Sequence, residues 1–372
     1  MLLLALRNLF QSKARLLMST VGLALALLLV LALDAMLTGI QTQVSAYIDR
    51  SGADVWVAQK GVRNMHMASS TLSTATIDKV RAVNGVASVT PILFQLSTVS
   101  AAGDSHIVYA IGLPPSPAAG APWRVVAGTG VPGVGETVID RSVAESSRIR
   151  LGSSVNILGQ HFRVVGLTEG TLNIVNSVAF ISMSDFMTIR GTSDSVSYLL
   201  VKTSSGRSPD AVAASIEREL GDVTALSRTA FSAQEREVIA GMTTDIVAIM
   251  NLVGLLIGLA VMALTVYTAT LARRAEYGVL KAVGARNRDL YLVVLLQAAI
   301  GLVLGLSASI LLTWLLALVV PAVKPSIVLE LSLGSIAKVG SMALVIAAAA
   351  AILPVMQMAR LDPSAVFRRK VA

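Results

Sequence analysis

Four long apolar runs constrain the fold of this chain more than any other feature of its sequence. They cover residues 16–37, 246–271, 290–320 and 336–355. About 20 apolar residues suffice for a helix to cross a hydrocarbon core of about 30 Å, so each run predicts a membrane-spanning helix. The third run is longer than one crossing requires, which predicts a helix that tilts or projects. Only 14% of the 372 residues are charged, against about 25% in soluble domains, and the mean hydropathy is +0.73.

A cleaved signal peptide is the alternative interpretation of the first run, because Arg7, Lys13 and Arg15 precede it. The run is longer than the roughly 7–15 residues of a signal-peptide core, and no clear small-x-small cleavage site follows it. We therefore favour a span that is retained in the mature protein.

The basic residues predict the orientation of the spans. They cluster before the first run, between the second and third, and after the fourth: Arg7, Lys13 and Arg15; Arg273, Arg274, Lys281, Arg286 and Arg288; Arg360, Arg368, Arg369 and Lys370. Short loops rich in Lys and Arg stay in the cytoplasm, so both termini are expected inside and residues 39–242 outside. The same placement explains the net charge of +8 without nucleic acid as a partner.

Ionisable residues are nearly absent from the runs. Asp34 and Lys338 lie near the expected outer ends and are interpreted as interfacial residues. Ion-coupled carriers place carboxylates or broken helices at the membrane midplane, and this sequence offers neither in a convincing form.

Small residues recur at a spacing of four in two of the runs, at Gly254 and Gly258 and at Gly301 and Gly305. This spacing lets helix backbones approach closely, so we expect these glycines to serve helix packing.

The segment between the first two runs predicts a two-lobed α+β domain at 39–242. Strand-like segments broken by Gly, Pro and Ser occur at 54–58, 86–99, 107–113, 155–158, 162–167, 178–182 and 198–202, with a tight hairpin near Gly159-Gln160. Helices are expected at 76–83, at 209–220 after an N-cap at Ser208, and at 233–239, continuing into the second run.

Five prolines between residues 112 and 135 predict a linker between the two lobes. The central lobe is then 136–192, inserted into an outer lobe formed by 50–113 and 195–228.

Catalytic and metal sites are not indicated. The chain has no Cys, and its three histidines, His66, His106 and His161, are separated from one another and from any spaced carboxylate set. Met65, His66 and Met67 resemble a soft patch, but an exposed loop is the simpler interpretation.

The cytoplasmic segment 273–285 carries the strongest functional signal. Because the chain has no G-x-x-x-x-G-K-[ST] sequence, ATP would have to be used by another subunit. Tyr277, Leu280 and Gly284 recur at i, i+3 and i+7, which gives a short helix an apolar face for a partner groove, rimmed by Glu276 and Lys281. An amphipathic turn on the membrane surface is the alternative.

Three stretches make the chain similar to a known family: ALRNLFQSKAR before the first run, RRAEYGVLKAVGARNRDLYLVVLLQAAIGLVLG, and the ending LPVMQMARLDPSAVFRR. They resemble the FtsX/MacB-type permeases, the type VII ABC transporters. The resemblance implies that the segment 274–285 is a coupling helix that docks on an ATPase, with Arg274, Glu276, Tyr277, Gly278, Leu280, Lys281 and Gly284 as the candidate coupling residues.

The resemblance also implies the organisation of the whole chain. A cytoplasmic amphipathic segment at 1–15 precedes the first span at 16–38 and the extracytoplasmic domain. An FtsX-like permease domain follows at 243–355, and a cytoplasmic tail at 356–372. The expected location is the bacterial plasma membrane.

The partners implied are a separate ATPase, which binds ATP and Mg, and a second permease subunit, most simply an identical one. MacB itself carries its ATPase at the N-terminus, whereas this sequence begins almost at the first span. An extracytoplasmic adaptor or substrate protein is a further expected partner. This chain would itself be non-catalytic and hold no cofactor.

Three functions remain open from the sequence. The first is a permease that exports a substrate or transmits force. The second is a regulator that activates an extracytoplasmic enzyme, and the third is a membrane receptor without an ATPase. No motif in the external lobes selects a substrate.

Overall fold

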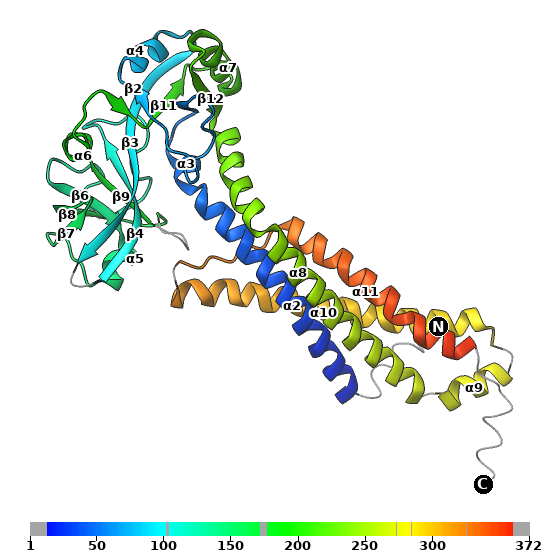
Figure 1. Ribbon diagram of the computed structural model, residues 1–372. Helices are drawn as coiled ribbons and strands as arrows, with labels where there is room; N and C mark the ends of the chain where they lie inside the picture. The colour runs from blue at the N-terminus through cyan, green and yellow to red at the C-terminus, as the bar shows by residue number, and fades with distance from the viewer. Residues whose placement is uncertain are drawn as a thin grey trace. The chain divides into compact units, whose positions relative to one another are not determined.

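The computed structural model describes residues 13–101, 104–171, 177–272, 274–283, 285–324 and 326–359. The chain divides into two units (Figure 1). A helical unit contains residues 1–38, 243–323 and 329–372, and an external unit contains residues 39–242 together with the short segment 324–328. This last segment comes from the loop between the third and fourth apolar runs.

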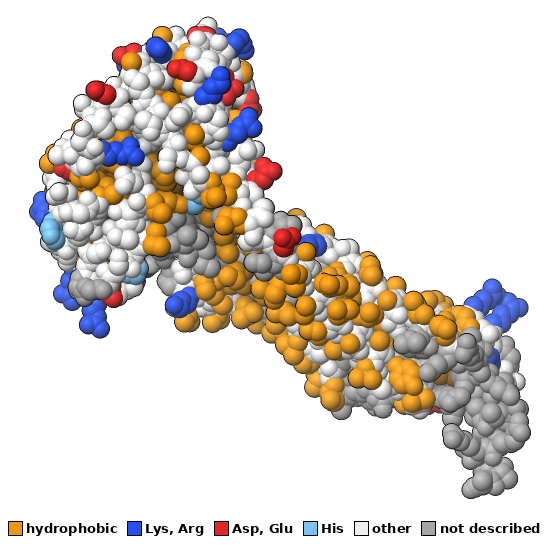
Figure 2. Space-filling view, in the orientation of Figure 1, with side chains coloured by type: hydrophobic (Ala, Val, Ile, Leu, Met, Phe, Trp, Pro, Cys, Tyr) orange, Lys and Arg blue, Asp and Glu red, His pale blue; other side chains and the backbone are white. Residues whose placement is uncertain are grey.

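Four helices are long and apolar enough to cross a membrane, as the sequence predicts. They are α2 (Lys13–Val44), α8 (Arg228–Ala272), α10 (Asn287–Val323) and α11 (Leu333–Ala359), with apolar spans Thr20–Val44, Val247–Ala272, Asn287–Val323 and Leu333–Ile352. The short helix α9 (Arg274–Ala282) follows α8. Apolar side chains cover much of the visible face of the helical unit (Figure 2). Leu252, Leu311 and Trp314 are among the exposed apolar side chains of this unit. This surface suits a lipid environment.

The core of the helical unit is formed where these helices face one another. Leu27 and Leu31 of α2, Met262 of α8, Val294 of α10 and Ile346 of α11 are all buried in one cluster. Helices that are apolar on every side can bury one face against their neighbours and present the other to lipid.

A ten-stranded mixed sheet organises the external unit. The strands are β1 (Val55–Gln59), β3 (Val86–Ala101), β4 (Asp104–Leu113), β5 (Val125–Gly128), β6 (Glu136–Asp140), β7 (Ser154–Ile157), β8 (Gln160–Thr168), β9 (Ser177–Ser182), β11 (Tyr198–Thr203) and β12 (Val223–Ser227). Their order is β12-β1-β11-β3-β4-β9-β6-β8-β5, and β7 pairs with β3 and β8. Strands β2 (Leu72–Ser73) and β10 (Ser195–Val196) form a separate pair.

Helices α3 (Ala46–Arg50), α4 (Ala75–Ala82), α5 (Arg141–Ser146), α6 (Met183–Arg190) and α7 (Pro209–Leu220) complete this unit. Helix α7 has the predicted bounds, with Ser208 at its N-cap position. All seven expected strands are present within a few residues. Five strands of the described residues were not predicted. Strands β5, β6 and β12 have only four or five residues, and β2 and β10 have two each.

The tight hairpin occurs one residue earlier than expected. Ile157 pairs with Gln160, so the turn residues are Leu158 and Gly159, both with positive φ. A two-residue loop of this kind matches the twist of the flanking strands, and Gly159 adopts positive φ without steric cost.

The lobe boundary predicted at residue 113 was wrong. Leu93 and Val108, from the segment assigned to the outer lobe, are buried with Phe162 and Phe186 of the central lobe. Strand β3 has 16 residues and its neighbouring residues alternate between faces, so Ile92 lies in a different core cluster from Leu93. The β3–β4 hairpin therefore contributes to both lobes.

The stretch 112–135 is also more than a linker. It contains β5, which pairs with β8, and Ala119 is buried in a core cluster. The Tyr47 hydroxyl donates to the Gly120 carbonyl at 3.0 Å, and the Gly120 N–H donates to the Ser51 carbonyl at 2.6 Å. These contacts fix the proline-rich stretch against the start of the external unit.

Candidate functional site

The predicted coupling segment forms α9, and its apolar face is turned into the chain itself. Tyr277 is 1% exposed and lies in the core of the helical unit, where Leu280 packs beside it. Gly278 is buried as well. Tyr277 therefore packs within this chain, where the sequence led us to expect an insertion into a partner groove, and Leu280 is partly buried against the same core.

The opposite side of α9 is the exposed one. Glu276 and Val279 are exposed, Lys281 is partly exposed, and Val283, directly after the helix, is 84% exposed. Arg274 begins the helix. Gly284 lies outside the described residues. The geometry thus separates the coupling candidates into an anchoring face and an outward face.

The predicted packing glycines lie at close helix contacts, with one exception. A Cβ added at Gly254 would be 2.1 Å from Val30 Cγ2, and one at Gly305 would be 2.9 Å from Leu23 Cδ2. At Gly258 the nearest atom is Ile346 Cδ1, also at 2.9 Å. Gly301 is different, because its nearest neighbour lies at an ordinary contact distance of 3.7 Å. Three of the four glycines therefore give neighbouring helices room to approach.

Asp34 and Lys338 form an ion pair that the sequence analysis did not predict. Lys338 Nζ lies 2.6 Å from Asp34 Oδ1, which joins α2 to α11. The Asp34 side chain is 15% exposed and that of Lys338 is 48% exposed. The sequence-based interpretation treated each residue as an interfacial residue by itself, whereas in the structure they bind each other.

A polar network joins α3 to the first turns of α8 within the external unit. Arg236 donates to Asp49 Oδ2 at 2.6 Å and to Ser45 Oγ at 2.8 Å, while Ser232 Oγ donates to Asp49 Oδ1 at 2.6 Å. Charge-assisted hydrogen bonds of this kind fix geometry as well as adding energy. The network therefore connects the first segment of the external unit, at Ser45 and α3, with its last segment, the first turns of α8.

His66 is not isolated, contrary to the sequence-based interpretation. Its Nδ1 is paired with Glu235 Oε1 of α8, and the Met65 N–H donates to the other carboxylate oxygen at 2.6 Å. Glu235 is fully buried, and Met65 is buried too, so this segment is no exposed loop; only Met67 is exposed. The partners are 169 residues apart, and no local sequence pattern signals them.

The other histidines have ordinary surroundings. His106 Nε2 lies 2.8 Å from Ser147 Oγ, and His161 is exposed. Among the described residues no group of three or more His, Cys, Asp or Glu side chains is arranged to hold a metal ion.

Comparison with protein families accounts for most of the chain. Residues 16–219 match the MacB-like periplasmic core domain, and residues 248–363 match the FtsX-like permease C-terminal region. The first match alone covers more than half of the 372 residues.

The chain belongs to the FtsX/MacB-type ABC transporter permeases.

The chain is also similar to permeases of other organisms and, over part of its length, to solved external domains. The chain is 22% identical to an uncharacterized ABC transporter permease of Mycobacterium bovis over 373 residues, and this alignment covers 99% of each chain. It has the same identity and coverage with an uncharacterized ABC transporter permease of Mycobacterium tuberculosis. The extracellular domain of the ABC-type transporter YknZ from Gram-positive bacteria covers 47% of this chain and 99% of its own, at 16% identity and a TM-score of 0.37. The periplasmic region of MacB from Actinobacillus actinomycetemcomitans covers 50% of this chain and 94% of its own, at 13% identity and a TM-score of 0.38.

The family and the four apolar helices make this chain a membrane protein with a mixed α/β domain between its first two spans. Its relatives carry the name of ABC transporter permeases. An FtsX/MacB-type permease implies an ATPase partner and a permease pair.

Proposed function

We propose that this FtsX/MacB-type permease couples ATP hydrolysis by a separate ATPase to movement of its external unit, for export or for transmission of force. The ATPase binds ATP and Mg²⁺ and docks on the outward face of α9. The complex lies in the bacterial plasma membrane with both termini of the permease in the cytoplasm. A pair of identical permeases related by a two-fold axis is the simplest assembly.

The two faces of α9 carry this proposal. Tyr277 anchors the helix in the core of the helical unit, while Glu276, Val279 and Val283 face outward. A short helix anchored on one side and exposed on the other can receive a displacement and pass it to the helices that hold it. A free amphipathic turn has no such anchor.

The network around Asp49 supports the second half of the proposal. Helix α8 is continuous from Arg228 to Ala272, and its first turns are bonded to α3 through Arg236 and Asp49. Movement of α8 would therefore be transmitted to α3 as well. The external unit would then move as one body, because several hydrogen bonds together transmit the movement.

The test is a charge placed on the outward face. We expect Val283→Arg to weaken docking and to reduce permease-dependent ATP hydrolysis about tenfold or more, because an unpaired cation would be desolvated in the contact. Co-purification of the ATPase and its hydrolysis rate in the reconstituted complex are the measurements. Val283 is exposed, so folding of the permease should be unaffected.

Val134→Arg is the matched control. Val134 is another exposed valine, 75% accessible, but it lies in the external unit. Its substitution should leave ATPase binding and hydrolysis unchanged. Full ATPase binding and full stimulated hydrolysis by Val283→Arg would show that α9 is not the docking element.

A further inference from the structure

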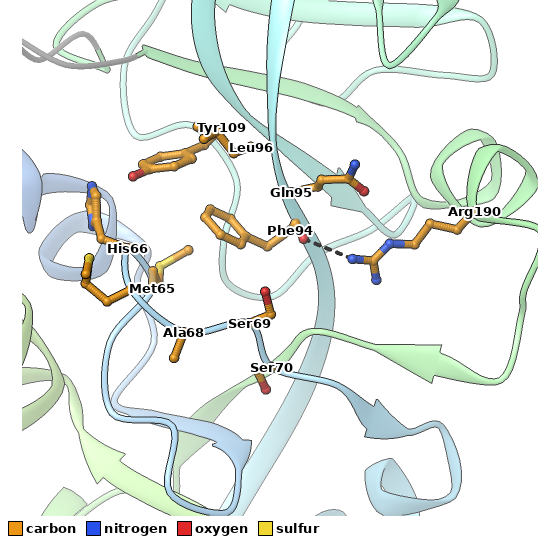
Figure 3. Close-up of a pocket in the computed structure, with 11 residues that line it drawn as sticks. Met65, His66, Ala68, Ser69, Ser70, Phe94, Gln95, Leu96, Tyr109 and Arg190 are labelled. Atoms are coloured by element: carbon orange, nitrogen blue, oxygen red, sulfur yellow. Dashed lines mark hydrogen bonds between the residues drawn. The ribbon is translucent and has the colours of Figure 1, made fainter.

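A cavity of about 380 Å³ lies in the external unit, between the segment 65–70, strands β3 and β4, and the end of α6. Figure 3 shows His66, Met65, Phe94 and Tyr109 gathered on one side of it, with Arg190 reaching in from the other. A volume of this size is within the usual range for small-molecule sites, roughly 300–1,000 Å³.

Aromatic rings form one wall of the cavity. The rings of Phe94 and Tyr109 have centroids 4.8 Å apart, and His66 packs edge-on against Tyr109 at 4.9 Å. Leu96, which also lines the cavity, is 59% exposed, so its side chain is open to a ligand. This wall offers a largely aromatic surface to a ligand body.

Arg190 supplies positive charge without a counter-ion. Its guanidinium donates to the Phe94 carbonyl at 3.4 Å and lies 5.4 Å from the centre of the Phe186 ring. No carboxylate pairs with it among the described residues, and none lines the cavity. A guanidinium has five N–H donors, so most of its donors remain for a ligand.

Burial lowers the pKa of Arg190, which means that part of its hydration is already lost. The group still carries its charge at neutral pH. A ligand anion would compensate for this lost hydration.

The His66 end of the cavity is fixed by the fully buried Glu235, which holds Nδ1. The other ring nitrogen, Nε2, is buried and has no hydrogen-bond partner among the described residues. His66 is thus a constrained polar group at the end of the aromatic wall.

We propose that this cavity binds a small organic carboxylate, whose anionic group pairs with Arg190 and whose apolar body packs on Phe94, Leu96 and Tyr109. A planar carboxylate matches the fork of a guanidinium in two parallel hydrogen bonds. The proposal goes beyond the coupling function, and its test needs no ATPase.

The test uses a ligand pair that differs only in charge. N-acetyl-L-tryptophan carries a carboxylate and an aromatic body, and its carboxamide has nearly the same shape without the charge. The chain has no native Cys, so Ser69→Cys places a single thiol on the cavity lining of the full-length protein. The rate of its alkylation by N-ethylmaleimide is measured at increasing ligand concentration.

We expect the carboxylate to slow alkylation of Cys at position 69 and to bind about tenfold or more tightly than the carboxamide. Arg190→Gln should abolish this preference, whereas Arg190→Lys should keep most of it. The Lys variant shows that a loss seen with Gln is a loss of charge and not of folding.

Two controls define specificity. Arg218→Gln removes an exposed charge on α7, outside the cavity, and should change nothing. A thiol at Ser116, exposed elsewhere in the external unit, should react at the same rate with and without ligand. The proposal is overturned by equal affinity for the two ligands, by a preference that persists in Arg190→Gln, or by no protection at all.

Discussion

Single buried or paired groups dominate the chemistry at the residue scale. The pair between Asp34 and Lys338 is the clearest case in the helical unit, because a carboxylate near the end of a span is costly without a cation. Lys338 is half exposed, and its amine can reach the membrane interface. We therefore expect this ion pair to stabilise the protein less than a fully buried pair does.

Removing the cation alone should therefore be worse than removing both charges. We expect Lys338→Ala to lower the free energy of unfolding of the helical unit by about 1–3 kcal/mol, because Asp34 is left unpaired. Asp34→Asn combined with Lys338→Gln should recover most of this loss. Thermal aggregation of the purified protein is the measurement, and Lys324→Ala, at another exposed lysine, is the control.

Tyr198 gives the external unit a pH dependence. Burial raises the pKa of Tyr198 well above its usual value, and the nearby Glu235 carboxylate and Tyr109 raise it further. Burial does the same to the pKa of Tyr47. The folded state therefore keeps protons that the unfolded state releases above about pH 10.

The sign of the effect follows directly. These tyrosines make their full contribution to the free energy of unfolding below about pH 10. As the pH rises above this value, the contribution falls by about 1.4 kcal/mol per pH unit for each proton. We expect Tyr198→Phe to reduce the slope of the free energy of unfolding against pH by the contribution of one proton. The contribution of Tyr47 should remain. Unfolding followed by circular dichroism at several alkaline pH values is the measurement, and an unchanged slope in the variant would contradict the assignment.

Glycine contacts set the packing at the scale of helices. Gly254 on α8 faces Val30 of α2, and Val is stiff in a helix because its branched side chain has essentially one rotamer there. The helices cannot make room for another methyl group at this point without a backbone shift. Gly301, with its nearest neighbour at 3.7 Å, has that room.

Gly254→Ala should destabilise the helical unit by about 1–3 kcal/mol through overpacking. Val30→Ala in the same chain should restore much of the loss, because it removes the atoms that clash. Gly301→Ala is the matched control and should be near neutral. The midpoint of thermal unfolding in detergent reports all three, and a Gly254→Ala variant with wild-type stability would contradict the contact.

At the scale of the whole molecule, the two units differ in surface chemistry and hence in expected environment. The helical unit exposes apolar side chains such as Leu311 and Leu318, whereas exposed charges such as Arg81 and Asp78 occur on the external unit. The basic clusters of the sequence predict that the external unit faces away from the cytoplasm.

Single thiols test this orientation because the native chain has no Cys. In intact cells, a membrane-impermeant thiol reagent should label Ser116→Cys in the external unit and leave Ala285→Cys after α9 unlabelled. Permeabilised cells provide the control, since both positions should then react. Equal labelling in intact cells, or labelling at position 285 alone, would reverse the topology.

Local patterns of hydropathy and capping were enough to predict the number and place of the spans, seven strands of the large sheet and the bounds of α7. The short helix α9 was also expected from its sequence, but the direction of its faces was not. Whether Tyr277 points to a partner or to its own chain depends on how the helices of the helical unit pack, and periodicity shows only which residues share a face.

Only the tertiary structure brought together the groups that carry charge and polarity. Asp34 and Lys338 are 304 residues apart, and His66 and Glu235 are 169 residues apart. Neither pair has a spacing motif, because each partner is positioned by a different helix or loop. Local sequence fixes which segments are apolar or regular, whereas the pairing of isolated polar side chains depends on how those segments pack, since a buried charge is stable only where the fold supplies its partner.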